Sequence, residues 1–309
     1  CGNCVKVCRQ CAKPCLETTD QVRALLQSDA PVAAILAPSF PVEFSKCDYR
    51  RVVGTLRTLG FERVCEVAFG ADLVAARYKK LLADNPEASY IATTCPAVVG
   101  YVERYHPEII PALAPIVSPM VAEARVLRRI YGDKLKVVFI GPCIAKKGEE
   151  SYSDKLQREI DAAITFQELR NLVEEAGIRP ESSILSDFDP PHAGLGALFP
   201  VSRGILQTAN LPENLIDGEV VVADGRHAFV EAIREFEAGD LQVRLLETLS
   251  CSGCIMGPGT TSQAPLFRRR AWVSQYVRQR LEDLEMGPPN AASTPGIYDD
   301  LDLSRSFFS

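Results

Sequence analysis

Four cysteines in three widely separated loops constrain the fold of this chain more than any other feature. They are Cys95, Cys143 and the pair Cys251 and Cys254. Pro and Gly residues next to these cysteines let the backbone turn tightly around a bulky group. Four thiolates are also the ligand set of a [4Fe–4S] cluster. Because the thiols come from distant parts of the sequence, we expect a fold that brings three loops together between its elements.

Composition indicates a globular protein and excludes several classes of partner. The chain has 309 residues, 47% of them hydrophobic, enough for one large or two medium domains. Its net charge is −6, and its basic residues are dispersed except at Arg268–Arg270, which we interpret as the solvated face of a helix. We therefore expect no nucleic-acid partner. The sequence shows no membrane-length apolar run and no signal peptide, so we expect a cytoplasmic protein without a membrane role. In a long chain of this kind, the eleven cysteines favour metal binding over a disulfide framework.

Short apolar runs alternate with amphipathic segments from residue 31 onward. Strands are predicted at 32–37, 63–67, 89–92, 136–140, 162–166, 219–223 and 243–246. Helices are predicted at 71–84, 98–105, 121–131, 167–176, 226–238 and 266–284. Thr165 and Glu168 fit a capping box at the start of one helix. This alternation predicts an α/β fold of two lobes, 26–133 and 134–285, each around a small, mostly parallel sheet, with the iron–sulfur site between them.

The two ends of the chain differ from this central part. Residues 1–16 contain five of the eleven cysteines and form a separate module. Cys1, Cys4 and Cys8 have the spacing of the last three cysteines of a bacterial ferredoxin motif, which predicts a partial [4Fe–4S] module. Cys11 and Cys15 are additional candidate ligands, and a zinc site is the alternative. Residues 286–309 are rich in Pro, Asn and Ser, which predicts a linker-like tail and allows for signalling domains in a longer chain.

The cysteine loops and their neighbours resemble the catalytic (H-cluster) domain of the [FeFe]-hydrogenases, the type that forms the C-terminal domain of the large subunit. The family signatures are Thr-Ser-Cys-Cys-Pro, Met-Pro-Cys-x2-Lys-x2-Glu and Glu-x-Met-Ala-Cys-x3-Cys, in this order. The resemblance implies that Cys95, Cys143, Cys251 and Cys254 hold a [4Fe–4S] subcluster, and that Cys254 also bridges to a diiron unit with CO and CN ligands. Further positions match the family's pocket: Lys146 the lysine that donates to a cyanide, Glu149 the glutamate three residues later, and Ala37-Pro38 with Ser39 the lining segment.

The departures from the family pattern concentrate in proton handling. Thr94 stands where hydrogenases have a proton-relaying cysteine, and a hydroxyl is a far weaker acid than a thiol. Tyr78 and Leu81 replace the glutamates of the family's proton path, and Ala114 replaces its serine, so we expect this path to be absent. Gly141 and Leu249 replace two methionines that shield the diiron unit, which predicts a roomier pocket. The third loop, Cys-x2-Cys, is one residue shorter than in the family. These changes resemble the divergent, sensory branch of the family.

Two functions from different classes follow from the resemblance. The first is a low-turnover enzyme for reversible H2 oxidation and proton reduction, serving H2 or redox sensing. Its partners would be H2 and protons, a redox partner such as ferredoxin, and diiron maturation proteins. The second is a non-catalytic [4Fe–4S] protein, like the eukaryotic relatives in cluster assembly. A structural zinc protein is the weakest interpretation, because it gives no reason for Lys146 and Glu149 to follow Cys143.

Overall fold

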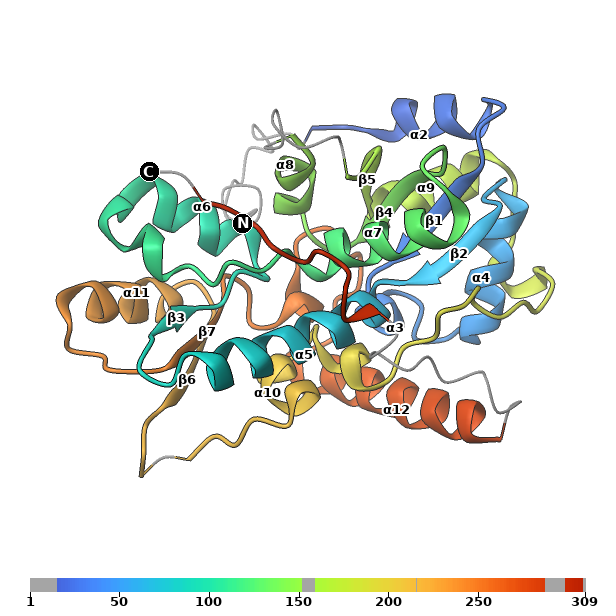
Figure 1. Cartoon of the computed structure of the whole chain (residues 1–309). Helices are drawn as coiled ribbons and strands as arrows, with labels where there is room; N and C mark the ends of the chain where they lie inside the picture. Colours follow the sequence, from blue (N-terminus) through green and yellow to red (C-terminus); the bar gives the residue numbers. More distant parts are fainter. Residues whose placement is uncertain (1–15, 152–158, 215, 287–297, 308–309) are drawn as a thin grey trace, which may run out of the picture.

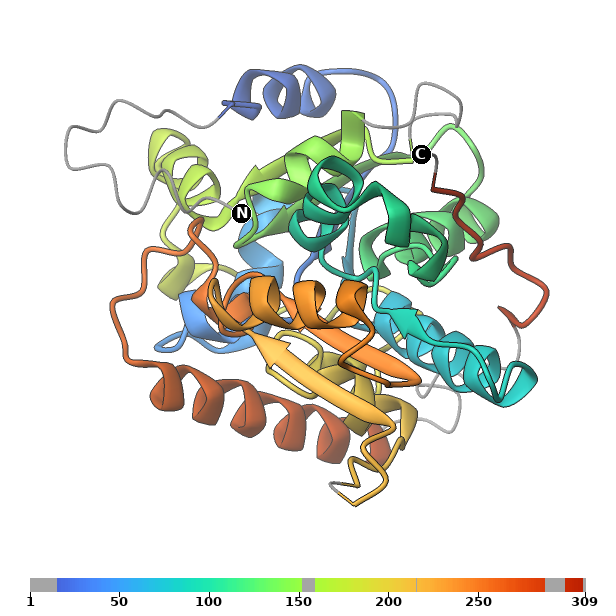
Figure 2. The ribbon, with the colours of Figure 1, turned by 90° about the vertical axis from the view of Figure 1, so that its left-hand side faces the viewer.

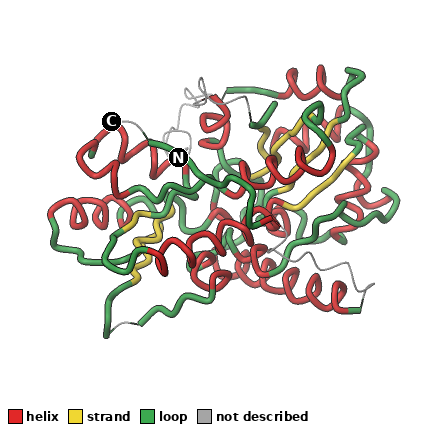
Figure 3. The backbone as a smooth tube through the Cα atoms, viewed as in Figure 1, coloured by secondary structure: helices red, strands yellow, loops and turns green. Residues whose placement is uncertain are grey.

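The computed structural model describes residues 16–151, 159–214, 216–286 and 298–307 (Figure 1). The cysteines of the predicted N-terminal module, Cys1, Cys4, Cys8 and Cys11, lie outside the described residues. Within the described ranges, the strands form two separate parallel sheets, which Figure 3 shows as two groups of yellow segments. An α/β fold with small parallel sheets is therefore confirmed.

The first sheet has the order β2-β1-β4-β5, and every neighbouring pair is parallel. Its strands are rich in Val, Ala and Ile and are almost completely buried, as expected for a parallel sheet covered on both faces. Helices α4, α7 and α9 pack against it. The bounds are β1 (Val32–Leu36), β2 (Arg63–Glu66), β4 (Lys136–Gly141), β5 (Ala162–Thr165), α2 (Thr19–Leu26), α3 (Phe40–Glu43), α4 (Tyr49–Thr58), α7 (Pro119–Tyr131), α8 (Ala145–Ser151) and α9 (Phe166–Glu175).

The second sheet has the order β3-β7-β6, again with parallel neighbours. Helix α6 contacts β7 and helix α11 contacts β6, and these elements enclose a second, smaller apolar cluster. Figure 2 shows this sheet and α11 on the side that faces the viewer. The bounds are β3 (Tyr90–Ile91), β6 (Val220–Asp224), β7 (Leu245–Leu249), α6 (Pro96–Tyr105), α11 (Ala228–Ala238) and the 3-10 helix η1 (Pro107–Ala112).

The remaining helices pack around one short 3-10 helix. Helix α5 (Val67–Asp84) packs against α7, α10 (Gly204–Ala209) and η3 (Leu195–Leu198). Helix α12 (Leu266–Glu285) contacts α3, η3 and η4 (Cys254–Met256), and a further turn, η2 (Pro180–Ser182), contacts α4. Among the described residues, no helix is both long and apolar enough to cross a membrane.

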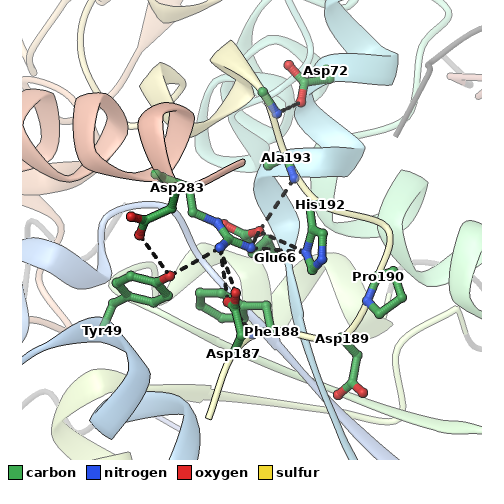
Figure 4. A network of polar contacts seen from close by, with 12 residues as sticks. Tyr49, Glu66, Asp72, Asp187, Phe188, Asp189, Pro190, His192, Ala193 and Asp283 are labelled. Atoms are coloured by element: carbon green, nitrogen blue, oxygen red, sulfur yellow. Dashed lines mark hydrogen bonds and ion pairs between the residues drawn. The ribbon is translucent and has the colours of Figure 1, made fainter. Parts of the chain in front are cut away.

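A buried charge network attaches α12 to the start of α5. The guanidinium of Arg280, which is 2% exposed, donates to Glu66 at 3.2 Å and to Asp187 at 3.0 Å. Tyr276 donates to the other oxygen of Glu66 at 2.8 Å, and Arg280 also donates to Tyr49 at 3.2 Å. Figure 4 shows Tyr49, Glu66 and Asp187 around this guanidinium. Because a buried charge that loses its partner costs several kcal/mol, about 3–5 in other proteins, this network fixes α12 against the first sheet.

Most predicted elements are present, with shifted ends. Helix α5 begins at Val67 rather than at residue 71, β3 is shortened to two residues, and β7 begins two residues later than expected. The capping box is confirmed, because the side chain of Thr165 accepts from the backbone of Glu168 and Glu168 accepts in return from the backbone of Thr165.

The assignment of strands to lobes needs correction. The expected lobes were the continuous stretches 26–133 and 134–285, but strand β4 lies beside β1 and strand β3 lies beside β7. Each sheet therefore contains strands from both halves of the chain. The short strand β3 pairs with β7, which lies more than 150 residues later in the chain, so the pairing does not follow the order of the sequence.

The tail also differs from expectation. Residues 298–307, part of the predicted linker 286–309, are docked on the molecule rather than extended away from it. The carbonyl of Leu303 accepts from the amide of Val117 at 3.0 Å, and the Leu303 side chain is 4% exposed. Leu303 is an apolar residue in a segment that is polar on average, so the composition of the segment does not indicate this contact.

Candidate iron–sulfur site

Two of the predicted loops leave neighbouring strands of the first sheet. Leu36 of β1 pairs with Ile140 of β4, and the amide of Ala37 donates to the carbonyl of Ile140 at 2.9 Å. The segments Ala37–Ser39 and Gly141–Cys143 therefore emerge side by side at the carboxyl edge of the sheet, where α/β proteins place their ligands. The structure thus brings these two predicted segments together.

The other two loops leave neighbouring strands of the second sheet. Ile91 of β3 pairs with Leu246 of β7, and Cys95 and Cys251 follow shortly after the ends of these strands. Cys95 is the N-cap residue of α6, which contacts both β7 and α8, the helix that follows Cys143. The site is thus built from the carboxyl edges of both sheets.

The third cysteine loop is held closely against the second. The amide of Gly259 donates to the carbonyl of Pro142 at 2.8 Å, and a Cβ on Gly257 would lie 2.6 Å from the same oxygen. Gly253, between the two cysteines, has φ +75°, and a Cβ there would lie 2.7 Å from the carbonyl of Pro200. Only glycine fits these close approaches, so the short Cys-x2-Cys loop has a specific backbone conformation.

The four thiols lie close enough to interact electrostatically. Burial raises the pKa of the Cys143 thiol to about 11, with further increases from the charges of Cys95 and Cys251 and an opposing effect of Lys146. Burial, then Cys143, Cys95 and Cys251, raise the pKa of Cys254 well above its ordinary value. An environment that disfavours thiolates on their own suits a cationic iron–sulfur core, which compensates their charge.

Zinc is the alternative metal for a set of four cysteines, and it requires a compact arrangement. The four sulfurs of a tetrahedral zinc site lie within about 4 Å of one another, given a Zn–S distance of about 2.3 Å. In the described ranges, no group of three His, Cys, Asp or Glu side chains is arranged to hold one metal ion. The six described cysteines are thiols rather than disulfides.

Lys146 and Glu149 form a buried pair at the second loop. The ammonium of Lys146, whose side chain is 11% exposed, donates to Glu149 at 2.6 Å, and the Glu149 side chain is 4% exposed. The charge of Lys146 acts on Cys143 and on Cys254, so the lysine is close to both thiols. The structure thus places both residues at the candidate site, where they bond each other.

A buried hydroxyl in the site has unused hydrogen-bonding capacity. Ser39 is 1% exposed, and its Oγ has no partner among the described residues. Leaving a buried hydroxyl unpaired is costly, so its presence at this edge indicates a polar occupant. Ser202, Ser250 and Thr248 have equally unpaired buried hydroxyls in segments that adjoin the third loop. The residues present therefore fit an inorganic group with hydrogen-bond acceptors.

The expected roomier pocket is not found at Gly141. A Cβ on Gly141 would lie 2.5 Å from the ring of Phe139 and 2.9 Å from the Cβ of Ala37. The ring of Phe139 therefore occupies the space next to Gly141. Leu249, the second position of this kind, is 6% exposed at the end of β7.

The proton-path positions contain a closed hydrogen-bond group. Tyr78 is completely buried, and its hydroxyl lies 3.1 Å from Oγ1 of Thr93, which also reaches the carbonyls of Ala114 at 3.0 Å and Ile116 at 2.8 Å. Burial raises the pKa of Tyr78 to about 12. Thr94 is half-buried, directly before Cys95.

Two charged residues that sequence reasoning missed support the third loop, and the first is Arg269. It is 6% exposed and donates to the carbonyls of Ile255 at 2.8 Å and Ala264 at 2.6 Å, and also to Ser262. The expectation that Arg268–Arg270 is a solvated face is thus wrong for Arg269. A signal existed: Arg269 and Arg280 share the helical spacing of Val273 and Tyr276, which places them on the buried face of α12.

Glu43, the second, binds the neighbouring residues of the same segment. Its side chain is buried, and it accepts from the hydroxyl of Thr260 at 2.6 Å and from the amide of Thr261 at 2.8 Å. A Glu within the short apolar segment Phe40–Glu43 gives little indication of this role from sequence.

The fold and the four converging thiols define a protein of the iron–sulfur class. A comparison with family models then gives a match over residues 30–258 to the iron only hydrogenase large subunit, C-terminal domain. This match covers most of the chain, and the chain belongs to this family. The resemblance inferred from its motifs is confirmed.

The relatives include proteins named as hydrogenases and proteins named as cluster assembly factors. The chain is 29% identical over 196 residues to iron hydrogenase 1 of Clostridium pasteurianum, covering 58% of this chain and 34% of that protein. It is 27% identical over 242 residues to the NADP-reducing hydrogenase subunit HndD of Solidesulfovibrio fructosivorans, covering 68% and 41%. It is also 27% identical over 158 residues to the cytosolic Fe-S cluster assembly factor NAR1 of Yarrowia lipolytica, covering 46% and 32%. The chain therefore spans well under half the length of these relatives.

Solved structures establish the same fold. A variant of [FeFe]-hydrogenase HydA1 from Chlamydomonas reinhardtii superimposes with a TM-score of 0.71 at 20% identity, covering 93% of this chain and 95% of that one. A HydA structure described for stepwise H-cluster assembly gives a TM-score of 0.66 at 22% identity, covering 89% and 90%. At this identity the likeness concerns the fold.

Proposed function

We propose that the chain binds a [4Fe–4S] cluster through Cys95, Cys143, Cys251 and Cys254, accepts a diiron unit beside it after maturation, and acts as a low-turnover hydrogenase domain in H2 or redox sensing. The observation that carries this proposal is the convergence of four thiols with the buried Lys146. Packing of the two sheets alone gives no reason for a buried lysine to lie beside four thiols. The same proposal includes a redox partner such as ferredoxin, maturation proteins and a cytoplasmic location.

The chain's own residues would bind and orient the diiron unit, which supplies reversible cleavage of H2 when present. Lys146 would donate a charge-assisted hydrogen bond to an anionic ligand, a contact of about 1.5–3 kcal/mol. Ser39 would donate a hydrogen bond to the diiron unit from its hydroxyl, which has no partner among the described residues. Cys254 would help to hold the diiron unit beside the [4Fe–4S] cluster. Ala37 and Pro38 would exclude water on the side of β1.

Low turnover follows from the groups available for moving protons. Thr94 offers a hydroxyl where a thiol would be a stronger acid. Tyr78, with a pKa of about 12, does not ionise near neutral pH. The hydroxyl of Thr93 faces two carbonyl oxygens, which accept hydrogen bonds but donate none. This group therefore ends in the core rather than leading protons to the surface.

The second candidate is a non-catalytic iron–sulfur protein with the same four ligands. Two observations support it: the short contact of Lys146 with Glu149, which satisfies the lysine without any diiron unit, and the relatives named as cytosolic cluster assembly factors. In this case the chain would hold the [4Fe–4S] cluster alone.

The deciding experiment adds a synthetic diiron complex to anaerobically reconstituted protein and records infrared bands of iron-bound CO and CN. We expect bands from wild type, and shifted or missing bands from Lys146→Ala at unchanged four-iron content. Lys79→Ala, which removes the same charge from an exposed position on α5, is the matched control and should load like wild type. Uptake of four irons without any diiron bands would favour the non-catalytic candidate, and failure to take up four irons would reject both.

A further inference from the structure

Residues 298–307, here called the C-terminal strap, are bound to the body of the molecule by their backbone. The amide of Val117 donates to the carbonyl of Leu303 at 3.0 Å, and the amide of Arg305 donates to the carbonyl of Pro115 at 3.3 Å. Ile116 and Ser304 form an antiparallel bridge between these two contacts. Figure 2 shows the strap in dark red on the outside of the molecule. The strap thus adds a short extended segment beside residues 115–117.

Arginines of α5 and α7 hold the rest of the strap. Arg77 donates to the carbonyl of Leu301 at 3.2 Å, Arg125 to the carbonyl of Asp302 at 2.6 Å, and Arg129 to both oxygens of Asp300 at 2.7 and 3.0 Å. Two of these arginines bind backbone carbonyls of the strap, and the third binds the side chain of Asp300. Together they set the register in which the strap lies.

This register brings Arg305 to the buried pair at the cysteine site. Its guanidinium lies 3.3 Å from Oε1 of Glu149, whose other oxygen accepts from Lys146 at 2.6 Å. The exposed fractions of the three side chains are 18%, 4% and 11%. Glu103 of α6 is also near, since burial raises its pKa and the charge of Arg305 opposes this increase. One carboxylate therefore serves two cations, and one of those cations belongs to the strap.

We propose that the C-terminal strap regulates the charge at Lys146, with Arg305 as a positioning residue that binds the second oxygen of Glu149. When Arg305 is docked, it shares Glu149 with Lys146 and adds one positive charge beside Lys146, Glu149 and Glu103, and this charge acts on an anion at the thiols. When the strap is released, Lys146 and Glu149 form a neutral pair. At low dielectric, this change of one charge acts strongly on a nearby anionic cluster. The inference rests on the [4Fe–4S] cluster of the proposed function.

Thermodynamic linkage makes the coupling reciprocal. If docking of the strap stabilises a negatively charged cluster, then binding of the cluster must stabilise docking of the strap by the same free energy. If the cluster attracts Lys146 away from Glu149, the Glu149 carboxylate interacts more strongly with Arg305. The strap's two backbone hydrogen bonds at Val117 and Arg305 should then open less often.

The first experiment measures amide hydrogen exchange of peptides covering residues 115–117 and 303–305 in the apo protein and in the cluster-loaded protein. We expect slower exchange after loading in wild type, and no difference between the two states in Arg305→Ala. Arg305→Lys, which keeps the charge, should restore part of the difference. Arg77→Ala is the matched control: it weakens docking far from Glu149, so both states should exchange faster while their difference remains.

The second experiment measures the reduction potential of the cluster by electron paramagnetic resonance, which requires no catalytic activity. Arg305→Ala should shift the potential to a more negative value, because it removes positive charge near the cluster, and Arg77→Ala should not. Equal exchange of apo and loaded wild type, or an unchanged potential in Arg305→Ala, would overturn the coupling while leaving the iron–sulfur function intact. Wild type that takes up no cluster would instead overturn the proposed function, and with it the anion on which this coupling depends.

Discussion

Arg269 donates a hydrogen bond of 2.8 Å to the carbonyl of Ile255, the residue that directly follows Cys254. Its other nitrogens hold the carbonyls of Ala264 and Ser262, so a single guanidinium on α12 fixes the backbone on the far side of the third cysteine loop. A loop that must place two ligands at a cluster needs such external support, because its own glycines permit many conformations.

Replacing Arg269 should therefore impair both stability and cluster binding. We expect Arg269→Ala to lower the free energy of unfolding by about 3 kcal/mol, since it leaves buried carbonyls without charged donors. Iron content after anaerobic reconstitution should also decrease. Arg268→Ala is the matched control, because Arg268 is exposed and stacks on Trp272. Equal behaviour of the two variants in denaturant titration and iron analysis would show that Arg269 does not support the loop.

The ligand assignment predicts a difference between cysteines of similar exposure. Cys143→Ala removes one thiolate, and we expect less bound iron and an altered electron paramagnetic resonance spectrum. Cys47 is also half-buried but lies in the segment between α3 and α4, so Cys47→Ala should keep the iron content of wild type. Loss of iron in both variants, or in neither, would contradict the assignment.

The contrast between Cys143 and Arg269 shows what the sequence could reveal. The cysteine loops were identifiable because thiols, Pro and Gly combine in short, chemically specific patterns, and the strands because apolar runs alternate with amphipathic helices. Arg269 and Glu43 were missed because their roles depend on which distant carbonyl or hydroxyl faces them. The placement of β3, β4 and β5 in other sheets than the expected lobes imply, and the docking of residues 298–307, likewise depend on long-range pairing that local patterns do not encode.

The low-turnover hypothesis makes Thr94 a test position. Thr94→Cys introduces a thiol next to Cys95, and a thiol passes protons far more readily than a hydroxyl near neutral pH. We expect this variant to evolve H2 faster than wild type once both contain the diiron unit, as judged by equal infrared band intensity. Thr94→Ser, which keeps the hydroxyl, should stay at the wild-type rate. An unchanged rate in Thr94→Cys would locate the limiting step elsewhere, for example at the closed group of Tyr78 and Thr93.

Glu43 predicts how stability depends on pH. Burial alone would raise the pKa of this carboxyl, but hydrogen bonds from Thr260, Thr261 and Arg170 outweigh it and lower the pKa below the ordinary value. The folded state therefore binds the proton less readily than the unfolded state, so the stabilisation is fully present above the unfolded pKa and is lost as pH falls through the folded value. We expect Glu43→Gln to lower the free energy of unfolding by about 1–2 kcal/mol at pH 7, because a neutral amide forms weaker bonds with these donors. The difference from wild type should shrink as the pH is lowered towards about 3, below the unfolded pKa of a glutamate. Denaturant titrations of both proteins at several pH values measure this, and a difference that is independent of pH would mean that the Glu43 carboxylate is not stabilised by its charge.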